Sequence, residues 1–215
     1  MRLAIGSLFA FAMLLALPAC AQPLEKFQEG KHYFAIDPPQ PTSSGNKIEV
    51  LEVFMYTCPH CYDLEPYLEK WKATKADDVA YSAFPAAWNE PVEAFARAFY
   101  AAETLGILEA SHEKFFAAIH KEHKPFRSIE DIAEWYSQFG VTKEQFLSAA
   151  NSFAVNTKIN RSKAMVPRWG VAGTPTVIVD GKYRFDVSSA GGHQNVGELI
   201  DFLVAKERAA KKASS

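Results

Sequence analysis

Short apolar runs between turn residues predict four β-strands in this chain. The first run is rich in Val and aromatic residues and is too short for a helix. Both of its faces are mostly apolar, which is typical of a central strand covered on both sides. The last two runs flank Asp180-Gly181, a dipeptide that favours a two-residue hairpin turn. The predicted strands are residues 48–56, 79–84, 176–179 and 182–185.

Apolar residues at helical spacing predict a helix directly after the first strand, then a block of four helices, and a last helix near the end of the chain. Thr142 and Gln145 form a capping-box pattern at the start of the fourth helix of the block. Glu198 is placed to cap the last helix, whose basic tail is expected to be a solvated end. The block is expected at residues 91–106, around 115–119, at 128–140 and from 142 to about 166, and the last helix near residue 195.

The order of these elements indicates the α/β class, with a helical block between the second strand and the hairpin. The polar, Pro-rich residues 22–45 are interpreted as an extended approach to the first strand. With 48% apolar residues the chain can bury a sizeable core without disulfide staples.

The first 21 residues have the pattern of a secretory signal peptide. A positive charge at Arg2 precedes an apolar stretch from residue 3 to 17, and small residues follow at 19–21. The stretch is short for a bilayer-spanning helix, which needs about 20 apolar residues. Export would place the protein in an oxidising compartment, where disulfides persist.

Cleavage after Ala21 would leave a net charge of about −3, which does not fit a nucleic-acid binder. It would also leave Cys58 and Cys61 as the only cysteines, which excludes a framework of structural disulfides. An alternative remains at Cys20, because residues 17–20 also resemble a lipoprotein signal in which this cysteine carries the lipid.

The candidate chemistry lies in Cys58-Pro59-His60-Cys61, where the first strand ends. Pro59 suits the first turn of a helix, because its missing N–H would have no intrahelical partner there. Cys58 at the N-cap would then face unpaired N–H groups and the positive end of the helix dipole, which stabilise a thiolate. A protonated His60 would add a second positive charge. We expect an exposed attacking sulfur on Cys58 and a shielded resolving sulfur on Cys61.

Two other interpretations of the cysteine pair are open. The pair could bind zinc together with His120 and His123, although the spacing of the histidines is shorter than usual and they lie far down the chain. It could also be a structural disulfide, but so small a ring constrains little of the unfolded chain and contributes little stability. Redox chemistry is the interpretation that the pattern favours, with no metal and no cofactor.

A strand that ends in CxxC, a helical insertion, and then Gly173-Thr174-Pro175-Thr176 before a hairpin resemble the thioredoxin fold. The dipeptide within Cys58-Pro59-His60-Cys61 resembles the DsbA family of periplasmic thiol oxidants, and the resemblance spans nearly the whole mature chain. It implies a thioredoxin fold with an inserted helical domain. The expected division is a signal peptide at 1–21, a thioredoxin-like part at 22–85, the inserted domain at 86–168 and a second thioredoxin-like part at 169–215.

The resemblance also implies roles for particular residues. Pro175 would be cis and face the active-site sulfur, and it would bind substrate together with Thr174. Glu52, six residues before Cys58, falls where the family has a buried acid. Its parity with Val50 on an otherwise apolar strand independently favours burial. Many family members have Val where this chain has Thr174, and Thr is common in related isomerases and reductases.

The resemblance further implies a protein disulfide oxidoreductase that donates the Cys58-Cys61 disulfide to newly exported proteins. Its partners would be unfolded or partly folded exported proteins and a quinone-linked, DsbB-like membrane reoxidase. A reductase or isomerase of the same fold is the alternative. The isomerase interpretation is weakened because the segment before the first strand is too short for a separate dimerisation domain. A monomer is expected.

Overall fold

The computed structural model describes residues 26–213, in which a five-stranded sheet has the strand order β1-β5-β4-β2-β3. Strands β2 and β3 are parallel, whereas the pairs β2–β4, β4–β5 and β1–β5 are antiparallel. The strands are β1 (Phe34–Ala35), β2 (Ile48–Phe54), β3 (Val79–Pro85), β4 (Thr176–Val179) and β5 (Tyr183–Asp186). The four predicted strands are confirmed to within about two residues at their ends.

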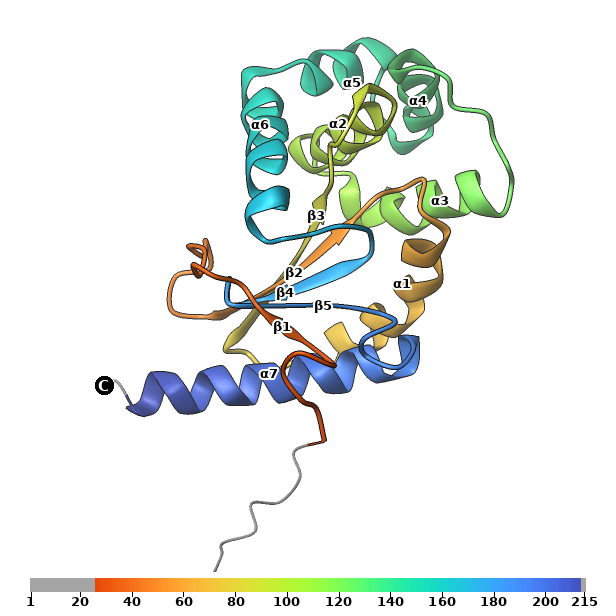
Figure 1. The fold of residues 1–215 in the computed structure, drawn as a ribbon. Helices are drawn as coiled ribbons and strands as arrows, with labels where there is room; N and C mark the ends of the chain where they lie inside the picture. Colours follow the sequence, from red (N-terminus) through yellow and green to blue (C-terminus); the bar gives the residue numbers. More distant parts are fainter. Residues whose placement is uncertain (1–25, 214–215) are drawn as a thin grey trace, which may run out of the picture.

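Seven helices surround this sheet in the described part of the chain. Helices α2 to α6 gather at one end of the sheet, while α7 crosses the molecule at the other end (Figure 1). The helices are α1 (Pro59–Lys72), α2 (Glu90–Thr104), α3 (Leu108–His120), α4 (Ile129–Tyr136), α5 (Lys143–Ala150), α6 (Phe153–Arg168) and α7 (His193–Ala213), and a 3₁₀ turn (Ser137–Phe139) follows α4.

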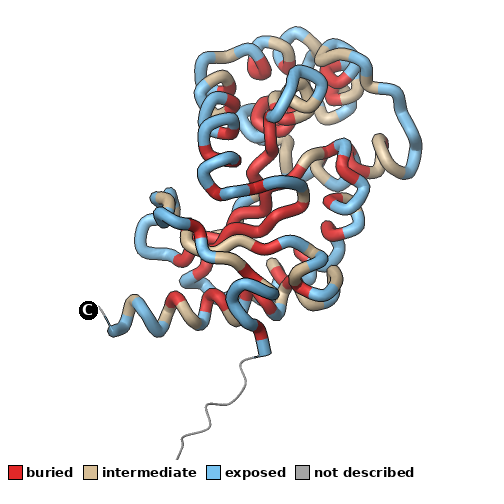
Figure 2. Tube along the Cα trace, in the orientation of Figure 1, coloured by how far each residue is buried: buried red, intermediate tan, exposed pale blue. Residues whose placement is uncertain are grey.

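Strand β2 is the centre of the molecule, because all seven of its residues are buried. The side chains of Ile48 and Val50 pack with α1 and α7, whereas Leu51 and Val53 pack on the other face with the end of α6. Phe54 joins a third apolar cluster inside the helical block. The continuous buried path through the sheet in Figure 2 follows from this placement, and it explains why the sequence of β2 is apolar on both faces.

Two elements differ from their prediction because the apolar pattern does not mark them. Strand β1 was not predicted, since two residues are too few to show a period; Phe34 pairs with Arg184 in β5. A single helix was expected from residue 142 to about 166, and this was wrong. The chain leaves the helix at Asn151, and Ser152 begins α6 by accepting a hydrogen bond from the N–H of Val155 at 3.2 Å.

The last helix begins at His193, two residues before the expected start. Glu198 forms an ion pair with Lys26 and does not cap the helix. The described part of the chain has no helix whose length and hydropathy suit it to crossing a bilayer. The predicted signal peptide and Cys20 lie outside the described residues.

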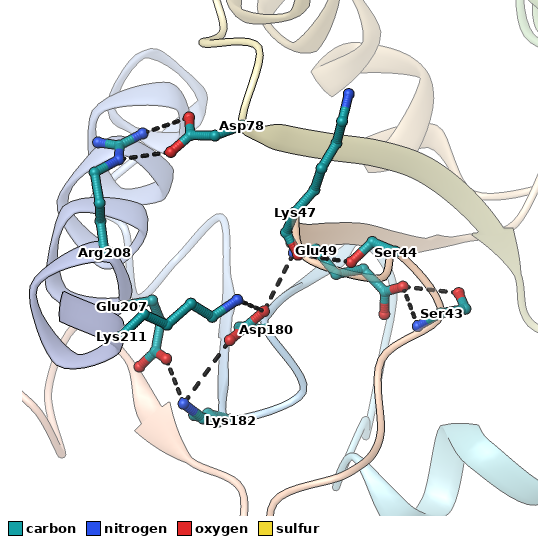
Figure 3. Close-up of polar contacts among 10 residues, drawn as sticks. All are labelled: Ser43, Ser44, Lys47, Glu49, Asp78, Asp180, Lys182, Glu207, Arg208 and Lys211. Atoms are coloured by element: carbon teal, nitrogen blue, oxygen red, sulfur yellow. Dashed lines mark hydrogen bonds and ion pairs between the residues drawn. The ribbon is translucent and has the colours of Figure 1, made fainter. Parts of the chain in front are cut away.

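Three of the four basic residues in the predicted solvated tail, Lys206, Arg208 and Lys211, form ion pairs, which corrects the prediction; Lys212 is exposed as expected. Figure 3 shows Arg208 held by both carboxylate oxygens of Asp78, each at 2.7 Å. Lys182 lies between the buried carboxylates of Asp180 and Glu207 and forms ion pairs with both. These contacts connect α7 to the β4–β5 turn and to the residue before β3. They therefore hold the end of the sheet that lies away from the cysteines.

We expect Ser152→Ala to lower the free energy of unfolding by about 1 kcal/mol, because it removes the side chain that caps α6. Ser152→Asp is the matched control, since an Asp side chain accepts the same hydrogen bond. Urea denaturation of both variants measures the difference. Equal stability of the Ala and Asp variants would show that the break between α5 and α6 does not depend on this cap.

Candidate active site

The cysteine pair lies at the start of α1, shortly after β2 ends. Cys58 is the N-cap of α1 with an extended backbone, and Pro59 occupies the first turn, as predicted. The N–H of Cys58 donates to the carbonyl of Met55 at 3.1 Å, and the N–H groups of Cys61 and Tyr62 donate to the carbonyl of Cys58 at 3.2 Å. The side chain of Cys58 makes no capping hydrogen bond, so its sulfur remains available at the positive end of the helix.

Both cysteines are free thiols that differ in their access to solvent. Cys58 retains 8% of its surface exposed, whereas Cys61 retains none. Cys61 lies on the inner face of α1 together with Leu64 and Leu68. The expectation of an openly exposed Cys58 was too strong, because Cys58 belongs to the buried apolar cluster that extends into the helical block. The order of access was right: an attacking group reaches Cys58 first.

The two thiols also differ in acidity. The pKa of Cys58 is lowered to about 5, first by a hydrogen bond from the Cys61 thiol, with smaller effects from the Thr174 side chain and the backbone N–H groups of Cys61 and His60. Burial opposes this shift. The pKa of Cys61 is raised far above its ordinary value, first by burial, then by its hydrogen bond to Cys58 and by the charge of Glu52. At neutral pH the pair therefore holds one thiolate, on Cys58.

A loop far away in the sequence completes the environment of Cys58. The Thr174-Pro175 peptide bond is cis, and the carbonyl of Thr174 accepts a hydrogen bond from the Cys58 sulfur at 3.3 Å. The Thr174 hydroxyl is buried and has no hydrogen-bond partner among residues 26–213 while Cys58 is a thiol. It is thus free to donate to the sulfur once Cys58 ionises, which agrees with its effect on the pKa.

Glu52 lies within β2 on the face that packs against α1. It is fully buried, and its Oε2 accepts a hydrogen bond from the Tyr81 hydroxyl at 2.9 Å, whereas Oε1 has no partner among the described residues. Burial raises its pKa well above the ordinary value, and the charge of Glu65 adds to this effect. The Tyr81 hydrogen bond and Lys72 oppose it. The predicted burial of this acid is confirmed.

Sequence reasoning missed the polar groups that surround Glu52. Glu65 is buried on α1, four residues after Cys61 and so on the same helical face, and this spacing was a usable signal. The Oε1 atom of Glu65 lies 3.5 Å from Nε2 of His112 in α3, and the Nδ1 atom of His112 lies 2.6 Å from the Tyr56 hydroxyl oxygen. Only the packing of α3 against α1 and β2 brings His112 to this place, so no local pattern could have found it.

His60 lines a pocket of about 700 Å³ together with Thr174 and Pro175. The pocket opens next to the cysteines and continues along the ends of β4 and β5. The structure thus brings the predicted residues of the CxxC motif and of the proline loop to one place.

The histidines of the zinc alternative are not brought to the cysteines. The Nε2 atom of His120 is 2.7 Å from the Tyr56 carbonyl oxygen, and its ring stacks on Tyr62. Within residues 26–213, no three His, Cys, Asp or Glu side chains are grouped so that they could hold a metal ion.

Comparisons with known proteins agree on one family. A family model described as a DSBA-like thioredoxin domain matches residues 68–199. A thiol:disulfide interchange protein DsbA of Pseudomonas aeruginosa is 39% identical over 98% of this chain and 99% of its own length. The protein of the same name from Azotobacter vinelandii is 34% identical over 98% of this chain and 99% of its own length.

Solved structures show the same relationship. The crystal structure of Pseudomonas aeruginosa DsbA superposes with a TM-score of 0.83 at 40% identity, covering 88% of this chain and 98% of that one. The oxidoreductase NmDsbA1 from N. meningitidis superposes with a TM-score of 0.75 at 27% identity, covering 86% of this chain and 96% of that one. The fold is a thioredoxin fold with an inserted helical domain, and the chain belongs to the family of DSBA-like thioredoxin domain proteins.

Proposed function

We propose that Cys58 and Cys61 form the redox-active disulfide of a protein-thiol oxidant. The family membership makes the chain a thiol:disulfide oxidoreductase, and the acidity of the two thiols supports their assignment. Cys58 is accessible and has a pKa of about 5, whereas Cys61 is buried and its pKa is raised. Such a pair combines a good leaving and attacking sulfur with a shielded resolving one.

The proposed reaction transfers two electrons from a substrate dithiol to the cysteine pair; of the two protons that the substrate thiols lose, one ends on Cys61 and the other goes to solvent. A substrate thiolate attacks the Cys58 sulfur of the oxidised pair, the Cys58–Cys61 bond breaks, and Cys61 leaves as a thiolate that takes up a proton. A second substrate thiolate then attacks the substrate sulfur of the mixed disulfide and releases Cys58 as a thiolate. The substrate dithiol becomes a disulfide, and both cysteines end reduced.

The direction of transfer follows from the stability of the reduced form. A lowered pKa means that the protein favours the Cys58 thiolate, which exists only after reduction, so the disulfide is easily given up. We infer that His60 adds to this stabilisation with its charge as well as with its backbone N–H. Pro59 contributes by starting α1 at the sulfur.

Glu52 is proposed to exchange the proton of Cys61. Neither group has a direct route to water, and the Oε1 atom of Glu52 has no other partner among residues 26–213. A carboxyl group whose pKa is raised by burial keeps its proton to a higher pH than a solvated carboxyl group, so it can exchange a proton with a buried thiol. Tyr81 would hold the opposite oxygen of the carboxyl group in place.

The backbone at Thr174 and Pro175 is proposed to pair with an extended substrate segment. The substrates would be unfolded or partly folded exported proteins, and a quinone-linked, DsbB-like membrane protein would reoxidise the pair. A periplasmic location after removal of residues 1–21 fits this role. The alternative is a lipid anchor at Cys20 that would hold the protein at the membrane. We retain the division into thioredoxin-like parts at 22–85 and 169–215 with an inserted helical domain at 86–168, and a monomer as the active form.

Trapping of substrates tests the cysteine assignment. In Cys61→Ala the Cys58 thiolate still attacks disulfides of exported proteins, and no neighbouring thiol displaces it from the mixed disulfide, so we expect disulfide-linked complexes with exported proteins to accumulate. Cys58→Ala should trap at least about tenfold less, because the remaining sulfur is buried and has a raised pKa. Non-reducing gels of periplasmic extracts after acid quenching measure this. Equal trapping by the two variants would contradict the assignment.

Titration of the reduced protein tests the Cys58 thiolate. Absorbance at 240 nm should show one thiolate with a midpoint near pH 5. Because the folded-state pKa is lowered, the thiolate's contribution to stability is full above the unfolded pKa of about 8.5 and declines as pH falls, vanishing below about 5. The stability difference between the reduced protein and Cys58→Ser should follow this course. A Thr174→Val variant should titrate at higher pH, and a midpoint unchanged by this substitution would remove the hydroxyl from the mechanism.

Replacement of Glu52 tests the proton exchange. At pH 7, Glu52→Gln should raise the free energy of unfolding by about 1–2 kcal/mol, the size of an uncompensated buried polar group. Since the pKa of Glu52 is raised in the folded state, this gain should disappear as pH falls towards the ordinary carboxyl pKa. Disulfide transfer near neutral pH should be slower, at the step in which Cys61 leaves and takes up a proton. Urea denaturation and stopped-flow kinetics measure the two effects.

Glu49→Gln is the matched control for Glu52→Gln. Glu49 is also a buried carboxylate of β2, but its Oε2 accepts hydrogen bonds from the N–H and hydroxyl of Ser43 at 2.8 Å. This substitution should lower stability and leave disulfide transfer unchanged. If Glu52→Gln is neither more stable nor slower, the Cys61 proton travels by another path.

A further inference from the structure

The pocket beside the cysteines holds one fixed positive charge. It runs from the CxxC motif past the proline loop to the start of α7, and most of its lining is apolar or backbone. Its ionisable lining residues are His60, Arg184, Asp186 and His193. Asp186 is engaged in the turn after β5, where its carboxylate accepts a hydrogen bond from the N–H of Ser189 at 2.7 Å. Of the lining side chains, Arg184 therefore carries the fixed positive charge, while the one acid is engaged in the turn.

Arg184 is the fixed charge among them. Its guanidinium lies over the ring of Phe34 at 5.1 Å from the ring centre. Its Nε atom lies so close to Gly170 that a Cβ there would be only 3.0 Å away, so the absence of a side chain at Gly170 leaves room for the arginine. Both neighbours hold the guanidinium in place, which reduces the entropy lost when a ligand binds it.

The guanidinium makes no hydrogen bond or ion pair with any described residue. This sets it apart from Arg97 and Arg208, which bind the carboxylates of Glu93 and Asp78. An arginine that is half-buried, held by two neighbours and unpaired in a pocket can form two parallel hydrogen bonds with a carboxylate. The guanidinium has no acceptor atom and would repel a lysine or arginine of a ligand.

The position of Arg184 puts it within reach of a bound substrate. It pairs with Ile178 in β4, and Asp186 pairs with Thr176, the residue next to Pro175. An extended chain advances about 3.3 Å per residue. Arg184 lies opposite Ile178, four strand positions or about 13 Å from Thr174, and its long side chain spans part of that distance. A segment that pairs with the backbone at Thr174 therefore brings residues two or three positions from its reacting cysteine within reach of the arginine.

We propose that Arg184 is a specificity-determining residue that favours substrates with a carboxylate two or three residues from the reacting cysteine. This rests on the proposed function, since it names a substrate class for that same site. The interaction lies outside the reacting sulfurs and changes the rate of capture. It does not change the chemistry of exchange.

Peptide kinetics with the oxidised protein test the proposal. The peptides carry two cysteines, are acetylated and amidated at their ends, and differ only in Glu, Gln or Lys two or three residues before or after the first cysteine. Acid quenching and chromatography measure the rate of their oxidation. At low ionic strength the Glu:Gln rate ratio should be about fivefold higher in the native protein than in Arg184→Gln, which corresponds to about 1 kcal/mol. This comparison cancels any effect of Glu on the acidity of the peptide thiol.

Two variants serve as controls. Arg127→Gln removes the same charge from a different pocket and should leave every rate unchanged. Arg184→Lys keeps the charge without the planar pair of donors and should retain part of the preference, which excludes a loss through misfolding. Added salt should reduce the preference in the native protein. A Gln peptide with a free carboxylate at its C-terminus shows whether a chain end serves as well as an acidic side chain.

The outcomes separate the two proposals. If all peptides are oxidised and the Glu:Gln ratio is the same in the native protein and in Arg184→Gln, the specificity proposal is overturned and the proposed function stands. If no peptide is oxidised, both fail. A ratio that falls equally in Arg127→Gln would show a general effect of net charge and would also overturn the role of Arg184.

Discussion

The contact between the Cys58 sulfur and the carbonyl of Thr174 is the constraint on which the site depends. The two residues are 116 positions apart. They meet because β2 and β4 are antiparallel neighbours, so that the last residues of β2 lie beside the first residues of β4. The helical block occupies the intervening chain without disturbing this pairing. An insertion that large is tolerated because β2 makes its sheet contacts on both sides and is buried on both faces.

Burial and hydrogen bonding give the two cysteine thiols opposite acidities. Cys58 lies at the start of α1, where donors face its sulfur, and its pKa falls; Cys61 lies one turn further along, inside the core, and its pKa rises. Glu52 resembles Cys61 in its environment. Both are buried groups whose charged forms the protein disfavours, so the protein favours a state in which at least one of them holds a proton.

The local elements of the site were predictable because each depends on neighbours in the sequence. The N-cap position of Cys58, the place of Pro59 and the β4–β5 turn follow from residue types and spacing, and the structure agrees. The break between α5 and α6 was not predicted, because the apolar pattern continues across it and only the cap formed by Ser152 marks it. The ion pairs of α7 were missed for a different reason: a basic residue has the same local pattern in solvent as beside a distant acid.

The sequence by itself determined the strand that carries the cysteines, their order of access and the burial of Glu52, since apolar parity and the helix start are local properties. Only the tertiary structure decided the partners of these groups. Tyr81 reaches Glu52 because β3 lies beside β2, and His112 reaches Glu65 because α3 packs against α1. Arg184 lines the pocket without an acidic partner among residues 26–213, because β5 lies between β1 and β4, with Phe34 and Gly170 on either side of its side chain. Charge and hydrogen bonding act over a few ångströms in space, and the distance along the chain gives no measure of that separation.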